Sequence, residues 1–368
     1  MAAAPSFAEL LAMPKEALAK MVVESRQGAA PSSAATPGPA LQVGAPSPQQ
    51  PGGKSAAGKS KGGKGKQREY RDFDMSKYPQ RHVALKVAYL GQAYDGLAFQ
   101  ENTDDTIEFH LFAALTKARL IIDRSSCQYS RCGRTDKGVS ALGQVVALML
   151  RSKIPADEEV DPSKELNYVH LINGLLPSEI RVLAWAYPPK GPDQWSARFD
   201  CRGRLYKYLF LKGNLDIELM RDAAKRFEGH HDYRNFCKMD VSAVDHFRRR
   251  INSFTVEPLN ECVGHSTSVE GSASDAQDDD ESMTGGHSLW AFVVDGKAFL
   301  WHQVRAMAAV LFMVGQGFEP PSIIDDLLDV GEKGYPAKPE YAIAACEPLI
   351  LYTCSFEGLT WNNEASEC

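Results

Sequence analysis

The chain lacks the close-set cysteine pairs from which zinc sites are built. Its eight cysteines, at positions 127, 132, 201, 237, 262, 346, 354 and 368, include no C-x-x-C pair. A zinc site would need such pairs, and a disulfide framework would suit a far smaller secreted chain. We therefore expect reduced thiols in a cytosolic or nuclear protein, and no metal site.

Other absences narrow the class of protein further. No run of about 18 apolar residues occurs, so we expect no transmembrane helix. Pro14 and Lys15 interrupt the N-terminal segment, which lacks the apolar core of a secretory signal and is better interpreted as a weak amphipathic helix. The G-x-G-x-x-G turn is missing, as are the H-x-E and P-C-x-x-C elements of zinc deaminases. These absences argue against a dinucleotide-binding sheet and exclude a deaminase.

Excess positive charge is also missing, because the formal net charge is -6. The distribution of charge matters more than its sum. The segment from Glu261 to Glu281 contains seven acids and no Lys or Arg, so the remainder of the chain carries +1. Residues 54 to 86 hold ten Lys or Arg against three acids. The charge pattern is therefore compatible with a polyanionic partner, although the net charge is not.

Two low-complexity segments divide the chain. Residues 27 to 67 are rich in Gly, Pro, Ala, Ser and Lys and have little to bury. We therefore predict a disordered extension over residues 1–77, ending in a basic tail that is a linker, a nuclear-import signal or a phosphate-binding arm. Residues 261–288 form the second segment, which we expect to be an acidic disordered insertion between two strands.

The remaining sequence mixes strand and helix patterns. Residues 82–90 alternate with period two, residues 144–150 form an apolar run, and residues 204–211 and 290–294 also resemble strands. Helices are expected after a Thr106 cap, from Phe299 to Val314 with a stop at Gly315, and around residues 322–328. Because no strict βαβ order appears, we predict an α+β fold.

The segment SRCGRTDKGVSALG, residues 130–143, concentrates the chemistry. It places Asp136 among Arg131, Arg134 and Lys137, and its glycines permit tight turns. Neighbouring cations keep a carboxylate ionised, as a nucleophile requires. Taken alone, such an Asp more often stabilises a turn, so the residue types by themselves leave both interpretations open.

The motif GRTDKGVSA resembles the signature of TruA-type pseudouridine synthases. Three further segments follow the family pattern in order: HVALKVAYLGQAYDGLAFQ, SARFDCRGRLYKYLF and FLWHQVRAM. The resemblance covers roughly residues 80 to 356. QENTDDTIE, RCGRTDKGVSA and DYRNFCKMD resemble more narrowly the eukaryotic branch, which modifies positions 38 and 39 of the tRNA anticodon stem-loop. Bacterial members usually differ at the positions of Lys137 and Ser140.

The resemblance implies a role for each matching residue. Asp136 would be the nucleophile, and Arg134 would fill the space left by the extruded nucleotide. Tyr206 would stack on the flipped uracil and take part in the final proton removal. Arg305 would pair with Asp136, a task that suits the planar guanidinium. Arg131, Lys137 and Arg204 are further candidate RNA contacts, whereas His302 and Gln303 are expected to be structural or to face RNA.

The resemblance also implies an architecture and partners. We expect the pseudouridine synthase fold, with two similar halves (residues 78–185 and 186–358) around a mixed, largely antiparallel sheet with a basic central cleft, followed by a tail over 359–368. We expect tRNA as the substrate, no cofactor, no membrane partner, a homodimer, and location in nucleus and cytoplasm. Two alternatives remain: a catalytically inactive tRNA-binding or tRNA-chaperone protein, and a metal-dependent nuclease or glycosylase.

Overall fold

The computed structural model describes residues 74–155, 158, 161–238, 246–259, 288–331 and 334–362. Its strands are β1 (Gln80–Tyr89), β2 (Ser130–Arg131), β3 (Ser140–Arg151), β4 (Ile180–Ala186), β5 (Cys201–Leu211), β6 (Gly229–Asp232), β7 (Arg248–Pro258), β8 (Leu289–Gly296) and β9 (Leu349–Phe356). Its helices are α3 (Ile107–Lys117), α4 (Tyr168–Asn173), α5 (Ile217–Arg226), α6 (Gln303–Gly315) and α7 (Ile323–Leu328). Short 3-10 turns cover Met75–Lys77, Pro162–Lys164 and Arg234–Phe236. The amphipathic N-terminal helix, the basic tail and the acidic insertion predicted from the sequence lie outside the described residues.

All nine strands form one sheet. The order is β4-β1-β3-β9-β5-β8-β7-β6, and β2 pairs with β3. The pairs are antiparallel except that of β3 with β9, which is parallel at Ser140 and Ala141. The predicted α+β fold with a mixed, largely antiparallel sheet is therefore confirmed. The basic central cleft stays a prediction.

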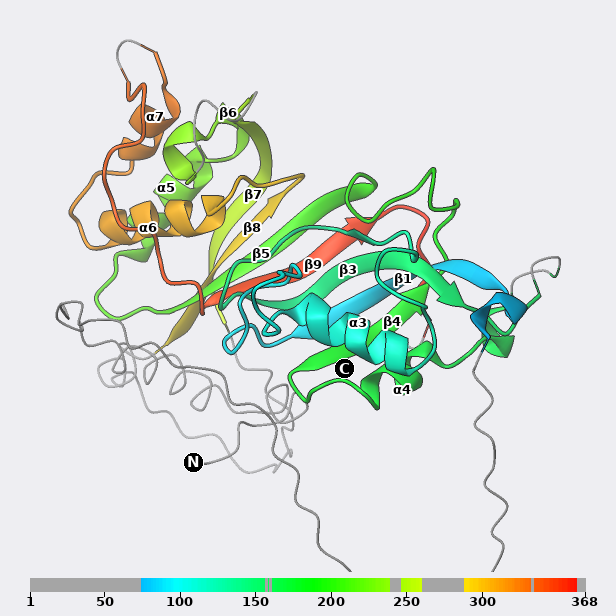
Figure 1. Ribbon diagram of the computed structural model, residues 1–368. Helices are drawn as coiled ribbons and strands as arrows, with labels where there is room; N and C mark the ends of the chain where they lie inside the picture. The colour runs from blue at the N-terminus through cyan, green and yellow to red at the C-terminus, as the bar shows by residue number, and fades with distance from the viewer. Residues whose placement is uncertain are drawn as a thin grey trace, which may run out of the picture.

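The last strand joins two groups of strands. Strands β1 to β4, which end at Ala186, lie with α3 and α4, whereas β5 to β8 lie with α5 and α6 (Figure 1). Strand β9 lies between β3 of the first group and β5 of the second. Strand β9 therefore connects the two groups in the middle of the sheet. Its pairing with β3, at Ser140 and Ala141, lies close in the chain to Asp136.

Strand β1 shows where local pattern and burial differ. The alternating sequence predicts one buried face, yet Ala84 and Ala88 on the other face are buried as completely as Val83 and Leu85. Strand β1 also lies inside the sheet, paired with β3 on one edge and with β4 on the other. A strand inside a covered sheet buries both faces, and small residues on one face allow the close packing.

Helix α3 begins as the sequence predicts. Thr106 is its N-cap, and the Thr106 hydroxyl accepts a hydrogen bond of 3.2 Å from the Phe109 backbone N–H. Glu108, expected in the first turn, is fully buried and accepts from the Phe99 backbone N–H at 2.9 Å and from the Tyr129 hydroxyl at 2.8 Å. It is therefore a core anchor for the segment between α3 and β2 rather than a surface charge.

Helix α6 begins and ends differently from the prediction. It starts at Gln303 instead of Phe299, because His302 adopts a left-handed conformation with φ 63° that no α-helix can contain. At its other end Gly315 belongs to the helix, and Gly317, with φ 74°, is the left-handed residue that ends the turn. A Cβ on Gly315 would lie 2.5 Å from the Met220 sulfur, so this glycine permits close packing of α6 on α5.

None of the helices within the described ranges is long and apolar enough to cross a membrane.

Candidate active site

The segment with Asp136 is a turn fastened to the first strands of the sheet. The Val139 N–H donates to the Asp136 carbonyl at 3.1 Å, and the Gly138 N–H donates to the Tyr94 carbonyl at 3.2 Å. Thr135 is buried, and its hydroxyl lies 2.7 Å from the Tyr89 hydroxyl at the end of β1. These bonds hold the backbone on both sides of Asp136 while its side chain remains 27% exposed.

Gly138 is needed for this turn. Its φ of 80° is disfavoured for residues with a Cβ, and a Cβ there would lie 2.9 Å from the Cys346 sulfur. The glycine predicted from the motif to allow a tight turn does so, and it also lets the chain segment before β9 approach.

Three side chains from the start of α6 surround the Asp136 carboxylate. The Trp301 indole N–H donates to Oδ1 at 3.0 Å, and His302 Nε2 lies 3.3 Å from Oδ2. Arg305 Nη1 lies 4.0 Å from the same Oδ2. The predicted pairing of Arg305 with Asp136 is thus a close ion pair without a direct hydrogen bond, and two neighbours the prediction did not include make the shorter contacts.

Arg305 is held in place by the segment that leads to β9. Its Nε donates to the Ala344 carbonyl at 2.8 Å, and the Ala344 N–H donates to the Arg305 carbonyl at 3.2 Å. The side chain is 14% exposed. One edge of the guanidinium is therefore fixed to the backbone while the other faces Asp136, a division of tasks that its planar fork permits.

His302 contacts Asp136 as a neutral ring. Burial lowers the pKa of His302 below its ordinary value, although the Asp136 carboxylate opposes this and the Arg305 cation adds to it. Its Nδ1 is buried and has no hydrogen-bond partner among the described residues. The neutral tautomer with hydrogen on Nε2 satisfies both observations, because Nε2 then donates to Asp136 and Nδ1 carries no hydrogen.

The N-terminus of α6 adds to the positive potential at the carboxylate. His302 is the N-cap of this 13-residue helix, and Arg305 stands in its first turn. The N-terminal end of a helix carries a partial positive charge that favours an anion beside it. The indole N–H, the imidazole, the guanidinium and the helix terminus thus converge on the Asp136 carboxylate.

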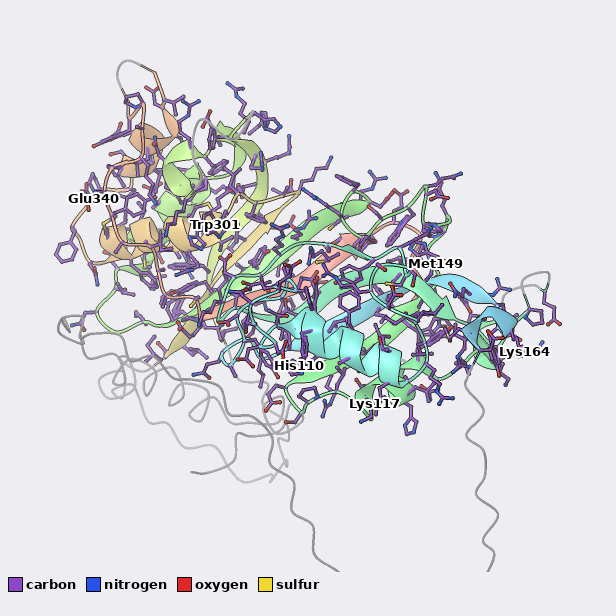
Figure 2. All side chains as sticks on the ribbon, in the orientation of Figure 1. His110, Lys117, Met149, Lys164, Trp301 and Glu340 are labelled. Carbon is purple, nitrogen blue, oxygen red and sulfur yellow. The ribbon has the colours of Figure 1, made fainter. Side chains whose placement is uncertain are left out.

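The sequence prediction missed Trp301, and it expected His302 to be structural or to face RNA rather than to contact Asp136. A helix from Phe299 would have placed them on successive helical positions with no relation to Asp136. The left-handed His302 instead forms a turn that presents both rings at the carboxylate; Figure 2 shows Trp301 at the beginning of α6. Trp301 is 51% exposed, and the Lys238 ammonium lies 5.8 Å from its ring centre. The only available signal was their position just before Arg305.

Tyr206 lies in the interior of the sheet, on β5. It is buried and meets Phe299 edge to face, with ring centres 5.1 Å apart. Burial raises the pKa of Tyr206 well above its usual value. Its phenol is therefore neutral at physiological pH, and Phe299 connects it to the turn that carries Trp301.

The predicted RNA contacts occupy two kinds of environment. Arg134 and Lys137 are exposed, and the Lys137 ammonium lies 2.7 Å from Asp95 Oδ1. Arg131 pairs with the buried carboxylate of Glu108. Arg134 and Lys137 thus face solvent near Asp136 in the chain, whereas Arg131 is bound in an ion pair with the buried Glu108.

Arg204 is buried, and its guanidinium donates to backbone carbonyls. Nη2 donates to the Cys132 carbonyl at 2.7 Å and to the Arg198 carbonyl at 3.3 Å, and Nη1 donates to the Lys297 carbonyl. Arg204 therefore fastens three segments to β5. That it also contacts RNA stays a prediction.

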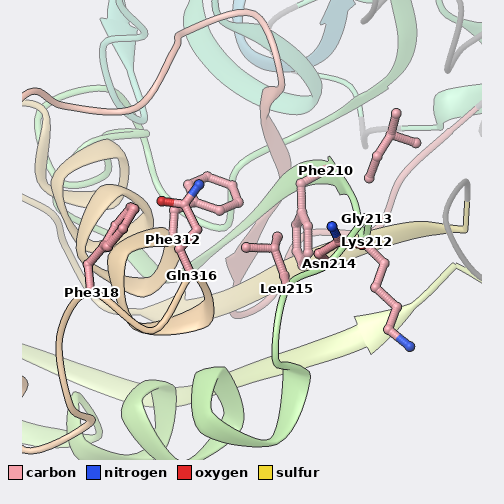
Figure 3. Close-up of a pocket in the computed structure, with 9 residues that line it drawn as sticks. Phe210, Lys212, Gly213, Asn214, Leu215, Phe312, Gln316 and Phe318 are labelled. Atoms are coloured by element: carbon pink, nitrogen blue, oxygen red, sulfur yellow. The ribbon is translucent and has the colours of Figure 1, made fainter.

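A pocket of about 600 Å³ lies elsewhere, at the end of β5 and α6 (Figure 3). Phe210, Phe312 and Phe318 contribute aromatic rings to it, and Lys212 lies at its edge. None of the predicted catalytic residues lines it. The chemistry of the pocket is thus separate from that around Asp136.

Comparison with known proteins gives a consistent result. A family model described as tRNA pseudouridine synthase matches residues 223–357, which include Arg305. The tRNA pseudouridine(38/39) synthase of Bos taurus is 48% identical over 302 residues, covering 79% of this chain and 59% of the relative. The enzyme of the same name from Saccharomyces cerevisiae is 40% identical over 299 residues, covering 79% and 61%.

A third relative is matched over more of its own length. A probable tRNA pseudouridine synthase of Caenorhabditis elegans is 37% identical over 313 residues, covering 80% of this chain and 73% of the relative. The chain spans about three-fifths of the length of the bovine and yeast relatives.

Proposed function

We propose, on the premise that this chain belongs to the tRNA pseudouridine synthase family, that it isomerises uridine to pseudouridine in the anticodon stem-loop of tRNA, at positions 38 and 39. One observation carries the proposal: a partly exposed carboxylate, Asp136, is held by an indole N–H, an imidazole and a guanidinium. A carboxylate oriented in this way, with a cation beside it, has the properties of a nucleophile.

The proposed reaction conserves atoms. Asp136 attacks the target nucleotide, the bond between C1′ and N1 breaks, the uracil rotates, and a bond forms between C1′ and C5. The C5 proton leaves, N1 gains a proton, and the aspartate is released. The isomerisation itself therefore calls for no oxidant, reductant or nucleotide cofactor.

The exposed cationic residues beside Asp136 have the properties needed to act on a uridine that is stacked inside an RNA stem. Such a base must first be rotated out of its stack, and something must occupy the space. Arg134 is exposed two residues before Asp136, so its side chain is free to enter the stem. Lys137 follows Asp136 in the chain, and RNA phosphates would compete with Asp95 for its ammonium.

Tyr206 and Phe299 would receive the base. A flipped base is bound by stacking on aromatic rings. Because burial raises the pKa of Tyr206, its phenol remains protonated, and it takes part in the last proton transfer by hydrogen bonding rather than as a phenolate. The proposed role thus needs the ring in place but no prior ionisation.

A catalytically inactive tRNA-binding protein is the second candidate function. Loss of Asp136, Tyr206 or Arg305 would have favoured it, and all three are present, with Arg305 beside Asp136. The metal-dependent hydrolase suits the site less well, because the side chains closest to Asp136 are those of Trp301, His302 and Arg305 and include no second carboxylate within the described residues.

The test is a map of pseudouridines in tRNA from cells that lack this protein. We expect loss at positions 38 and 39, restored by the wild-type chain and not by Asp136→Asn. Loss at another position would assign a different target, and restoration by Asp136→Asn would exclude the proposed nucleophile.

Assembly and location are further parts of the proposal. The family resemblance of the motifs supports a homodimer with tRNA as its partner, which sedimentation of the purified chain with and without tRNA would test. The ten cations of residues 54–86 support location in the nucleus as well as the cytoplasm. Imaging the chain before and after deletion of residues 1–67 would test this.

A further inference from the structure

Three cysteines that are far apart in the sequence meet inside the sheet. Cys132 follows β2, Cys201 is the first residue of β5, and Cys354 lies in β9. All three are buried, and their sulfur atoms lie within 4.8 Å of one another. Spacing along the chain gave no sign of this cluster, because each cysteine comes from a different strand region.

We propose that Cys132, Cys201 and Cys354 form a three-sulfur site for a thiophilic d10 cation, Zn²⁺ or Cu⁺. Zinc–sulfur bonds are about 2.3 Å long, so three sulfurs around one ion stand roughly 4 Å apart. The observed separations, all within 4.8 Å, require only small adjustments to reach that arrangement. The proposal rests on the arrangement of these three sulfur ligands.

The buried guanidinium of Arg204 supplies the charge balance. Arg204 donates to the Cys132 carbonyl at 2.7 Å, and none of the ion pairs formed among the described residues includes Arg204. A buried cation without an anion is unfavourable. Three thiolates around Zn²⁺ carry one net negative charge, as do two thiolates and a thiol around Cu⁺, and either complex would neutralise Arg204.

The ligand type selects the class of cation. All three donors are sulfur, and no His, Asp or Glu joins the group among the described residues. Thiolates favour Cu⁺ and Zn²⁺, whereas Mg²⁺ and Ca²⁺ require oxygen donors. A disulfide would join only two of the sulfurs and leave the third without a partner in the cluster. It would also supply no negative charge to balance the Arg204 cation.

The location indicates what the ion would do. Cys132 stands four residues before Asp136, Cys201 is on the same strand as Tyr206, and Cys354 is on β9. A bound ion would therefore tie the Asp136 segment to β5 and β9 without touching the reacting groups. Its role is structural, and the inference does not depend on the proposed reaction.

The experiment measures metal binding by the reduced, metal-free full chain. Zn²⁺ and Cu⁺ are titrated separately, without oxygen, against a chromophoric chelator, and thermal unfolding is followed with and without each ion. We expect one equivalent to bind and to raise the melting temperature. Cys132→Ser, Cys201→Ser and Cys354→Ser should each weaken this binding at least 100-fold.

Cys127→Ser is the matched control, since Cys127 is also buried but lies outside the cluster. It should bind the ion with wild-type affinity. If a cluster variant fails to fold, X-ray absorption of the loaded wild-type protein still counts the ligands, and three sulfurs are expected. Equal affinity in cluster and control variants, fewer than three sulfurs, or a disulfide in place of metal binding would overturn the proposal.

Discussion

Replacing Arg305 tests how Asp136 is held. Arg305 Nη1 is 4.0 Å from Asp136 Oδ2, a separation at which two unit charges interact by about 4 kcal/mol at an effective dielectric constant of 20. Because the carboxylate is 27% exposed, solvent screening reduces this to about 2 kcal/mol. If that energy orients the nucleophile in the transition state, Arg305→Met should slow single-turnover isomerisation by roughly 30-fold.

Arg305→Lys separates charge from geometry. Arginine donates from Nε to the Ala344 carbonyl while Nη1 faces Asp136, and one ammonium cannot do both. We therefore expect Arg305→Lys to lose most of the activity, at least tenfold, despite its retained charge. The assay is release of tritium from C5 of labelled uridine in tRNA, at saturating enzyme so that binding does not limit the rate.

Arg221 provides the matched control. It also donates from Nε to a carbonyl, that of Val256 at 3.2 Å, and from Nη1 to a carboxylate, that of Glu218 at 2.6 Å, but on the surface of α5. Arg221→Lys should leave the single-turnover rate unchanged. A near-wild-type rate for Arg305→Lys would refute the reasoning, because the guanidinium would then hold nothing that a simple cation cannot.

Three further predictions concern the same carboxylate. Asp136→Asn should abolish turnover while tRNA affinity stays within about tenfold, or ~1.4 kcal/mol, and pseudouridine formed by the pure variant would contradict the assignment. Trp301→Phe keeps the ring but removes the N–H that donates to Oδ1, so the single-turnover rate should fall by roughly 5-fold, the equivalent of about 1 kcal/mol for one hydrogen bond; an unchanged rate would show that the contact is dispensable. Folding lowers the pKa of His302, so the unfolded chain binds a proton at this residue more readily than the folded chain does. The free energy of unfolding should therefore fall as the pH drops below about 6.5 and through the pKa of the folded state. His302→Gln should weaken that dependence in chemical denaturation, and an identical pH profile would argue against the buried neutral ring.

Much of the local structure could be predicted from the sequence. The alternation in β1 and β5, the Thr106 cap and the glycine at position 138 each express a preference that depends on a few neighbouring residues. The motif around Asp136 and the identity of Arg305 are likewise visible in the sequence, since chemistry needs those residue types. Such features are local, and a window of ten residues contains the information.

The sequence by itself therefore determined these local features and identified Asp136 and Arg305 as candidates for the site. Only the tertiary structure decided that β9 lies between β3 and β5, that His302 turns Trp301 toward Asp136, and that Arg204 points inward to carbonyls. It alone brought Cys132, Cys201 and Cys354 together. The physical reason is that strand order, a strained backbone angle and the burial of a charge are settled by contacts between segments far apart in the chain, and no local pattern encodes those contacts.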